Sequence, residues 1–246
     1  IDAAMKLSYQ IQRDSGNKNK KFYISRVQSF NGATLHAMSV SDLPILKIYD
    51  DLLPKGIHKV SQHNPYARCK FDKSKNSCVC GKHYNECMGK LKNEKDEEYL
   101  ARQLLELEQK IEELGAENIC AFIGETQLGS LVGDVTPLKD YWSKIYQICN
   151  KNKIHVILDE VYCGMGRSGK IFNYSWYNFS PDFVVVGKNM TSGHAPLSAI
   201  ITKSKFQDII ANGSGRIQLG HTFQGYSLGI AACYELMKII NDDDLM

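Results

Sequence analysis

The chain has 246 residues, of which 43% are hydrophobic and 23% are charged, and its formal net charge is +3. These values are typical of an ordinary globular protein. Basic and acidic residues are interspersed and form no basic stripe, which argues against nucleic acid as a partner. No apolar stretch approaches the ~20 residues that span a bilayer, so no membrane partner is expected.

The predicted elements alternate between helices and strands. Residues 1–12 have helical periodicity with no cap before them, and the first residue is Ile1 rather than Met, so we expect a truncated chain. Strands are predicted at residues 22–25, 119–125, 154–160, 182–187 and 197–202, and helices from about residue 33 and at 96–114, 137–150 and 226–240. This alternation predicts the α/β class, with a mostly parallel sheet flanked by helices on both faces.

Residues 62–95 interrupt the alternation, because they are polar, lysine-rich and poor in periodic apolar residues. We expect a long surface excursion rather than a separate domain. Thiolates and an imidazole at short spacing can hold zinc, and the candidate ligands here are Cys69, Cys78, Cys80, His83 and Cys87. Their spacing matches no standard ligand pair closely, which favours free thiols in an inserted loop over a structural metal site.

The remaining four cysteines occur singly in apolar or helical context, at Cys120, Cys149, Cys163 and Cys233. We expect them to be reduced structural thiols, as in an intracellular protein. A cytoplasmic location follows, and an organelle is left open because the N-terminus is expected to be missing.

Charged residues follow two of the predicted buried strands. The strand at 183–186 ends at Gly187 and Lys188, and the strand at 155–158 ends at Asp159. Each has a plain explanation: a solvated lysine at a strand end, and an acid that caps the next turn. Parallel strands deliver both to one edge of the sheet, however. There a desolvated lysine can form a Schiff base with pyridoxal phosphate, and a buried carboxylate keeps the pyridinium nitrogen protonated.

Three ordered motifs carry a resemblance to a known family. The segments "ILDEVYCGMGRSGK", "GKNMTSGHAPLSA" and "GHTFQGYSLGIAA" resemble the class III aminotransferases, which are pyridoxal-phosphate enzymes of fold type I. The resemblance implies a three-layer αβα fold, a homodimer with shared active sites, and an amine or amino acid and a keto acid as partners. It also implies that residues 1–246 are most of the large domain. The family's phosphate-binding Gly-Ser turn, its N-terminal segment and its C-terminal small domain would lie outside the chain.

The resemblance also assigns roles to individual residues. Lys188 would form the internal aldimine and then act as the base in the 1,3-proton transfer, and Asp159 would hold the pyridinium nitrogen. Phe30 would cover one face of the ring and Val161 the other, although an isolated Phe is more often a core residue. Thr222 would donate its hydroxyl to the cofactor phosphate of the neighbouring subunit.

Three further residues have expected roles. Asn31 stands where the family usually has histidine, which changes a hydrogen bond near the ring. Glu125 would line the substrate pocket and pair with an arginine, or it is an ordinary cap or salt bridge. Arg167, in the glycine-rich "GMGRSG", is expected to anchor a loop or an interface.

The sequence therefore predicts a transaminase that moves an amino group from an amine or amino acid to a keto acid or aldehyde. An aminomutase, racemase or decarboxylase would use the same Lys188 and Asp159. A third hypothesis is an inactive fragment or a non-enzymatic binding module whose cysteine loop holds a metal.

Overall fold

The computed structural model describes residues 1–68, 71–72, 77–78, 88–129 and 131–246. The helices are α1 (Asp2–Asp14), α2 (Leu35–Val40), α3 (Asp96–Leu114), α4 (Tyr141–Lys151), α5 (Lys205–Asn212) and α6 (Ser227–Asp242). Short 3₁₀ segments are η1 (Pro44–Leu52), η3 (Ala116–Asn118), η4 (Asn173–Trp176) and η5 (Lys188–Thr191). The strands are β1 (Phe22–Arg26), β2 (Ile57–Val60), β3 (Phe71–Asp72), β4 (Ser77–Cys78), β5 (Ile119–Glu125), β6 (His155–Asp159), β7 (Phe183–Val186) and β8 (Ala199–Thr202).

The main sheet has six strands in the order β2-β1-β5-β6-β7-β8. All neighbouring pairs are parallel except β7 and β8, which are antiparallel. The expectation of a mostly parallel sheet in an α/β fold is therefore confirmed. The topology places the carboxyl ends of β1, β5, β6 and β7 along one edge, which is where sheets of this kind hold their ligands.

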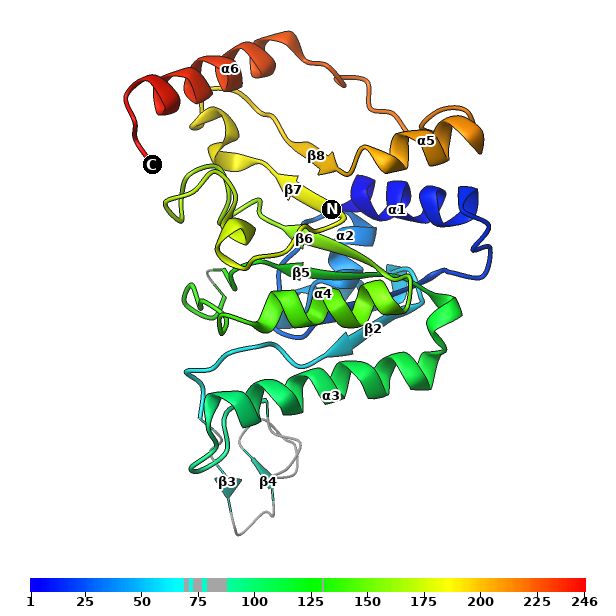
Figure 1. Cartoon of the computed structure of the whole chain (residues 1–246), viewed down its shortest axis with the longest axis vertical. Helices are drawn as coiled ribbons and strands as arrows, with labels where there is room; N and C mark the ends of the chain where they lie inside the picture. The colour runs from blue at the N-terminus through cyan, green and yellow to red at the C-terminus, as the bar shows by residue number, and fades with distance from the viewer. Residues whose placement is uncertain (69–70, 73–76, 79–87, 130) are drawn as a thin grey trace.

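Helices cover both faces of this sheet (Figure 1). Successive strand residues point to opposite faces: Val156 and Leu158 pack in the cluster with Trp142 of α4, whereas Ile157 packs with Met5 of α1. These two clusters form most of the core, and a third, smaller cluster contains Met165, Val184 and Val186. Their position explains why β5, β6 and β7 read as continuous apolar runs rather than alternating ones.

The long helix α3 forms where its periodicity predicts. Three acids occupy its first turn, which suits the positive end of the helix dipole. Leu100, Leu107 and Ile111 form its buried stripe, and Gly115 ends it with a φ of 76° that a residue with a side chain would adopt less readily.

Other boundaries differ from the expectation. The helix predicted from about residue 33 begins at Leu35, because Thr34 is its N-cap and accepts the backbone N–H of Ala37. The helix predicted at 137–150 begins only at Tyr141. The strand β2 and the helix α5 were not predicted, since each is short, with four and eight residues.

The described residues of the segment 62–95 include part of the core. Gln62 and His63 are buried, and the ring of His63 stacks between Tyr99 and Tyr141, with ring centroids 5.0 and 4.1 Å away. We expected this segment to lie on the surface, and its start instead lies in the core. The candidate metal ligands Cys69, Cys80, His83 and Cys87, and the side chain of Cys78, lie outside the described residues.

No three His, Cys, Asp or Glu side chains among the described residues are grouped so that they could hold a metal ion. None of the helices in the same part of the chain has the length and apolar character needed to cross a bilayer. Cys120, Cys149, Cys163 and Cys233 are free thiols, as expected.

Candidate active site

The predicted acid and lysine lie at the carboxyl edge of the sheet. Asp159 is the last residue of β6, and the strand register places it opposite Glu125 of β5 and Val185 of β7. Lys188 follows Val185 by three residues, just beyond the end of β7. The sheet therefore brings the two residues to one edge, as the sequence predicted. Burial raises the pKa of Asp159, and the nearby charge of Lys188 opposes that rise.

Asp159 is a buried carboxylate, 5% exposed. Burial raises its pKa above the ordinary value, because the charged form loses its hydration. Two donors oppose this rise: Asn31 Nδ2 donates to Oδ2 at 2.9 Å, and the backbone N–H of Val161 donates to Oδ1 at 3.0 Å. Each oxygen keeps a lone pair, so the carboxylate could also accept a hydrogen bond from a protonated ring nitrogen.

One polar side-chain atom of Asn31 accepts no hydrogen bond from the described residues. Its amide nitrogen is used by Asp159 and its backbone N–H donates to Ser41 Oγ at 2.8 Å, whereas Oδ1 is buried and has no hydrogen-bond partner among the described residues. An amide cannot lose a proton to Asp159 as an imidazolium could. Asn31 therefore fixes the orientation of the acid without taking part in its titration.

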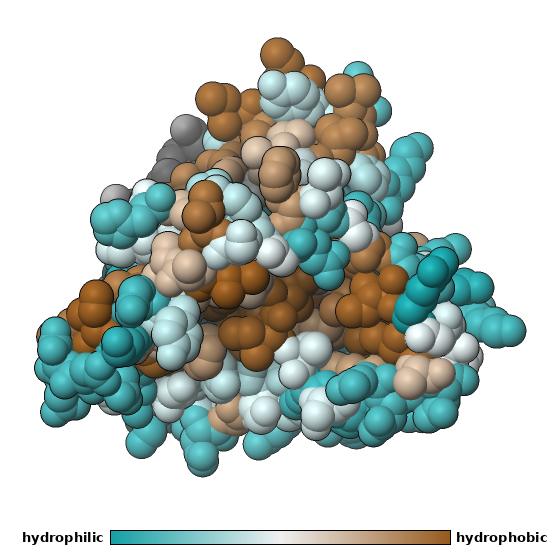
Figure 2. Space-filling model, turned by 90° about the horizontal axis from the view of Figure 1, so that it is seen from above, coloured by the Kyte–Doolittle hydropathy of each residue, from teal (hydrophilic) through white to brown (hydrophobic). Residues whose placement is uncertain are grey.

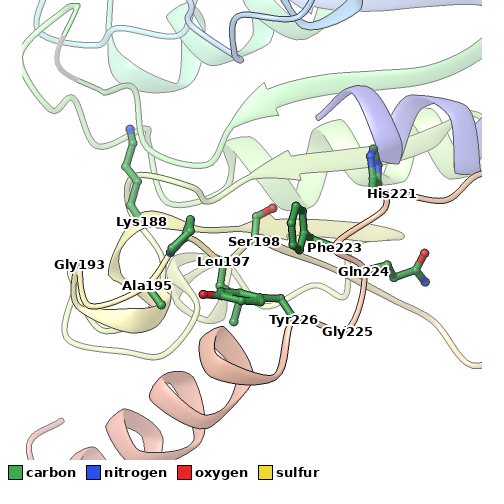
Figure 3. A pocket seen from close by; sticks show the side chains of 11 residues that line it. Lys188, Gly193, Ala195, Leu197, Ser198, His221, Phe223, Gln224, Gly225 and Tyr226 are labelled. Carbon is green, nitrogen blue, oxygen red and sulfur yellow. The ribbon is translucent and has the colours of Figure 1, made fainter.

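Lys188 lies on the rim of a cavity with a volume of about 960 Å³. The cavity is lined by residues 193, 195–198, 221 and 223–226, including Leu197, Phe223 and Tyr226. Figure 3 shows the Lys188 side chain extending away from Leu197 and Tyr226. The amine is exposed, and it has no hydrogen bond or ion pair with a residue that the structure describes.

Phe30 and Val161 are the two residues expected to cover a cofactor ring. Phe30 is 42% exposed, so the alternative of a core phenylalanine is wrong. Val161 is half-buried, directly after the β6 edge, and its N–H binds Asp159. Their placement fits a flat ring at this edge, because an exposed aromatic face and a branched apolar side chain stand near the acid.

Glu125 holds two loops in place through hydrogen bonds to their backbones. It is 8% exposed, and its carboxylate accepts the backbone N–H groups of Phe30 at 3.2 Å and Gly129 at 3.0 Å. Burial raises its pKa, and the adjacent Asp159 adds to the rise while Arg26 opposes it. In the described part of the chain no arginine or lysine forms an ion pair with it. This arrangement corresponds to the cap alternative, and it ties the position of Phe30 to the end of β5.

Thr222 is exposed and is not among the residues lining the cavity, although its neighbours His221 and Phe223 are. No hydrogen bond of its hydroxyl ties it to a residue that the structure describes. A hydroxyl in this position is available to a group from outside the chain, which is compatible with the expected role toward a second subunit.

Two residues of this edge were missed by sequence reasoning. Arg26, the last residue of β1, is 1% exposed, donates to the carbonyl oxygen of Glu125, and lies over the rings of Tyr141 and Trp142 at 5.9 and 5.1 Å. Tyr162, three residues after Asp159, lies beneath the amine of Lys188. The signal for Arg26 was a charge at the end of a buried strand, the same signal that identified Asp159.

A buried acid and an exposed lysine at the carboxyl edge of a mostly parallel sheet define the kind of site in which α/β enzymes bind a small cofactor. Comparison with known proteins identifies which kind. The family model "Aminotransferase class-III" matches residues 1–246. The chain belongs to the class III aminotransferase family.

Individual relatives agree with this assignment. An "Aminotransferase" of Gibberella zeae is 31% identical over 250 residues, covering 100% of this chain and 45% of that protein. The chloroplastic gamma aminobutyrate transaminase 3 of Solanum lycopersicum is 31% identical over 249 residues, covering 100% and 44%. The crystal structure of the omega transaminase from Pseudomonas jessenii in complex with PMP superimposes with a TM-score of 0.84 at 32% identity, over 99% of this chain and 50% of that one. The chain thus spans about half the length of these relatives.

Proposed function

We propose that this chain is part of a pyridoxal-phosphate-dependent aminotransferase that moves an amino group from an amine or amino acid to a keto acid or aldehyde. The observation that carries the proposal is the pairing of a buried carboxylate, Asp159, with the amine of Lys188 at the ends of adjacent strands. The family membership and the likeness to solved transaminases support it. An aminomutase, racemase or decarboxylase has no such support from these relatives.

Bound pyridoxal phosphate supplies an electron sink for the bonds at the substrate carbon next to the amine. Asp159 would hold a proton on the ring nitrogen, because a buried carboxylate with only two donors gains most from a third. Lys188 would hold the cofactor through its aldehyde carbon, with loss of water. When the substrate amine displaces it, the free Lys188 amine would take a proton from the substrate carbon that bears the amino group and give it to the former aldehyde carbon of the cofactor, which is the 1,3-proton transfer. Asn31 would keep Asp159 in place.

Phe30 and Val161 would bracket the ring, and Glu125 would position Phe30 through its backbone N–H.

Thr222 would donate its hydroxyl to the phosphate of the cofactor that a second subunit holds. What supports this last role is exposure: Thr222 precedes α6, whose Leu228 and Tyr234 are 67% and 71% exposed. Apolar atoms surround a hollow on this face of the molecule (Figure 2). Because monomers rarely expose such patches, we propose that a second copy of the chain covers it.

Two further expectations, on the extent of the domain and on the location of the protein, belong to this proposal. The chain would be most of the large, cofactor-binding domain, which agrees with its covering about half of each relative's length. A cytoplasmic location would suit the four unpaired thiols.

The test is covalent capture of the cofactor. The purified chain is mixed with pyridoxal phosphate, reduced with borohydride and digested, and the modified peptide is identified by mass spectrometry. We expect one modified lysine, Lys188, and loss of the label in Lys188→Ala. Lys139→Ala, an exposed lysine outside the Lys188 cavity, is the control and should keep the label.

Capture at several surface lysines, with no dependence on Lys188, would contradict the proposal. Incubation with candidate amines then separates the reaction types, because only transamination consumes a keto acid acceptor. A chain that binds zinc but captures no cofactor would instead support the binding-module hypothesis.

A further inference from the structure

The amine of Lys188 lies over an aromatic ring. Its Nζ is 5.5 Å from the centroid of the Tyr162 ring, within the ~6 Å at which an ammonium group and an aromatic face attract each other. In the described part of the chain this ring is the partner that the amine has, since no hydrogen bond or ion pair holds it there. The ring therefore favours one resting position of the free amine, in addition to the attraction of the Asp159 charge.

Tyr162 is itself fixed on two sides. Its hydroxyl donates to Asp134 Oδ2 at 3.2 Å. The guanidinium of Arg167 lies 4.8 Å from the ring centroid, and Arg167 Nε donates to the carbonyl oxygen of Tyr162 at 2.9 Å. A ring held at its hydroxyl, at one face and at its own backbone has little freedom to turn.

Arg167 also reaches the segment that carries the lysine. Its Nη2 donates to Asn189 Oδ1 at 2.9 Å. The backbone of Lys188 has a φ of 42°, which is unfavourable for a residue with a side chain and persists only where neighbouring groups hold it. The hydrogen bond to the next residue is one such restraint. Arg167 thus joins the loop that follows Asp159 to the turn that presents Lys188.

We propose that Tyr162 is a positioning residue for Lys188, whose ring holds the free amine at the sheet edge while Arg167 holds the turn. The importance of this placement rests on the proposed function. In that reaction the amine is repeatedly released and must meet the same carbon again, and small errors in the position of a reacting group cost much rate.

The experiment uses the whole chain without cofactor. Reductive methylation with ¹³C-formaldehyde turns each lysine into a dimethylammonium that keeps its charge, and the methyl signals are read by NMR. The Lys188 signal is assigned by its absence in Lys188→Arg. A methyl group above an aromatic ring is displaced upfield, so we expect the Lys188 signal to be displaced in the wild type and in Tyr162→Phe, and to return to the position of an exposed dimethyl-lysine in Tyr162→Leu.

The chain contains a matched control. Lys170 Nζ lies 4.4 Å from the ring centroid of Trp176, so its signal should remain displaced in every Tyr162 variant that folds. Should Tyr162→Leu not fold, Tyr162→Met keeps most of the side-chain volume without a ring and gives the same test. An undisplaced Lys188 signal in the wild type, or the same displacement in the Leu or Met variant, overturns the proposal. Since no cofactor is used, that result leaves the aminotransferase proposal to be judged by cofactor capture alone.

Discussion

The acidic residues at the carboxyl edge of the sheet differ in their surroundings. Glu125, Asp159 and Glu160 are all buried, and burial raises the pKa of each. The Glu160 carboxylate accepts the backbone N–H groups of Asn173 and Tyr174, both at 2.7 Å, at the start of η4. It is therefore a structural acid that fixes the loop after the site, whereas its neighbour Asp159 faces the proposed cofactor.

Glu160 should make stability depend on pH. Burial raises its pKa from 4.5 to about 7, so the folded state holds a proton that the unfolded state releases. The resulting stabilisation is present below pH 4.5 and is lost as pH rises through about 7; a shift of this size corresponds to about 3 kcal/mol. Urea unfolding at pH 4.5 and pH 8 should show this loss in the wild type relative to Glu160→Gln.

The comparison must be made between the two proteins at each pH, because buried histidines act in the opposite direction. Burial lowers the pKa of His63 to about 3 and of His155 to about 4, so both favour the folded state at higher pH. They are the same in both proteins and cancel in the difference. Parallel stability profiles for the wild type and Glu160→Gln would show that the Glu160 pKa is not raised.

At the scale of elements, β5 depends on a glycine to admit Arg26. A Cβ built at Gly124 would lie 2.9 Å from Trp142 Cη2 and 3.1 Å from Arg26 Nε. The ring belongs to α4 and the guanidinium is buried between it and the strand, so neither can move freely. The close approach of α4 to the sheet thus requires the absence of a side chain at this position.

Gly124→Ala should destabilise the fold by about 1–3 kcal/mol, the usual cost of overfilling a packed core. Thermal or urea unfolding measures it. Gly220→Ala is the matched control: its Cβ would meet only Gln224 Oε1, at 3.7 Å, so it should be neutral or slightly stabilising. Equal effects of the two substitutions would mean that the contact between β5, Arg26 and α4 is looser than described.

The same elements show what could be predicted from sequence. Buried strands ending in charge identified Asp159 and Lys188, because the parallel sheet follows from strand–helix alternation and sets both at one edge. The contacts of Tyr162 and Arg167 could not be predicted, since they depend on how two loops fold back on each other. Short elements, such as β2 and α5, were missed for the related reason that tertiary packing defines them.

At the scale of the whole molecule, α6 stands apart from the sheet (Figure 1), and Gly229 is its buried residue. If a second copy covers this helix, Leu228→Asp and Tyr234→Asp should each weaken self-association at least about 10-fold, equivalent to about 1.4 kcal/mol. Analytical ultracentrifugation over a range of concentrations measures this. Leu105→Asp, at a residue that is 52% exposed on α3, should leave the association unchanged. A wild-type chain that stays monomeric at all concentrations would refute the dimer proposal.

The alignment of β6 against β5 and β7 has a consequence for how this protein can change. Asp159 meets Glu125 on one side and Val185 on the other, and neighbouring residues along a strand face opposite ways. Inserting or deleting a single amino acid within β6 would turn the acid to the reverse surface of the sheet and bring an apolar side chain to the edge beside Lys188. Sequence drift in this strand is therefore confined to substitution, and its length cannot vary while the chemistry survives.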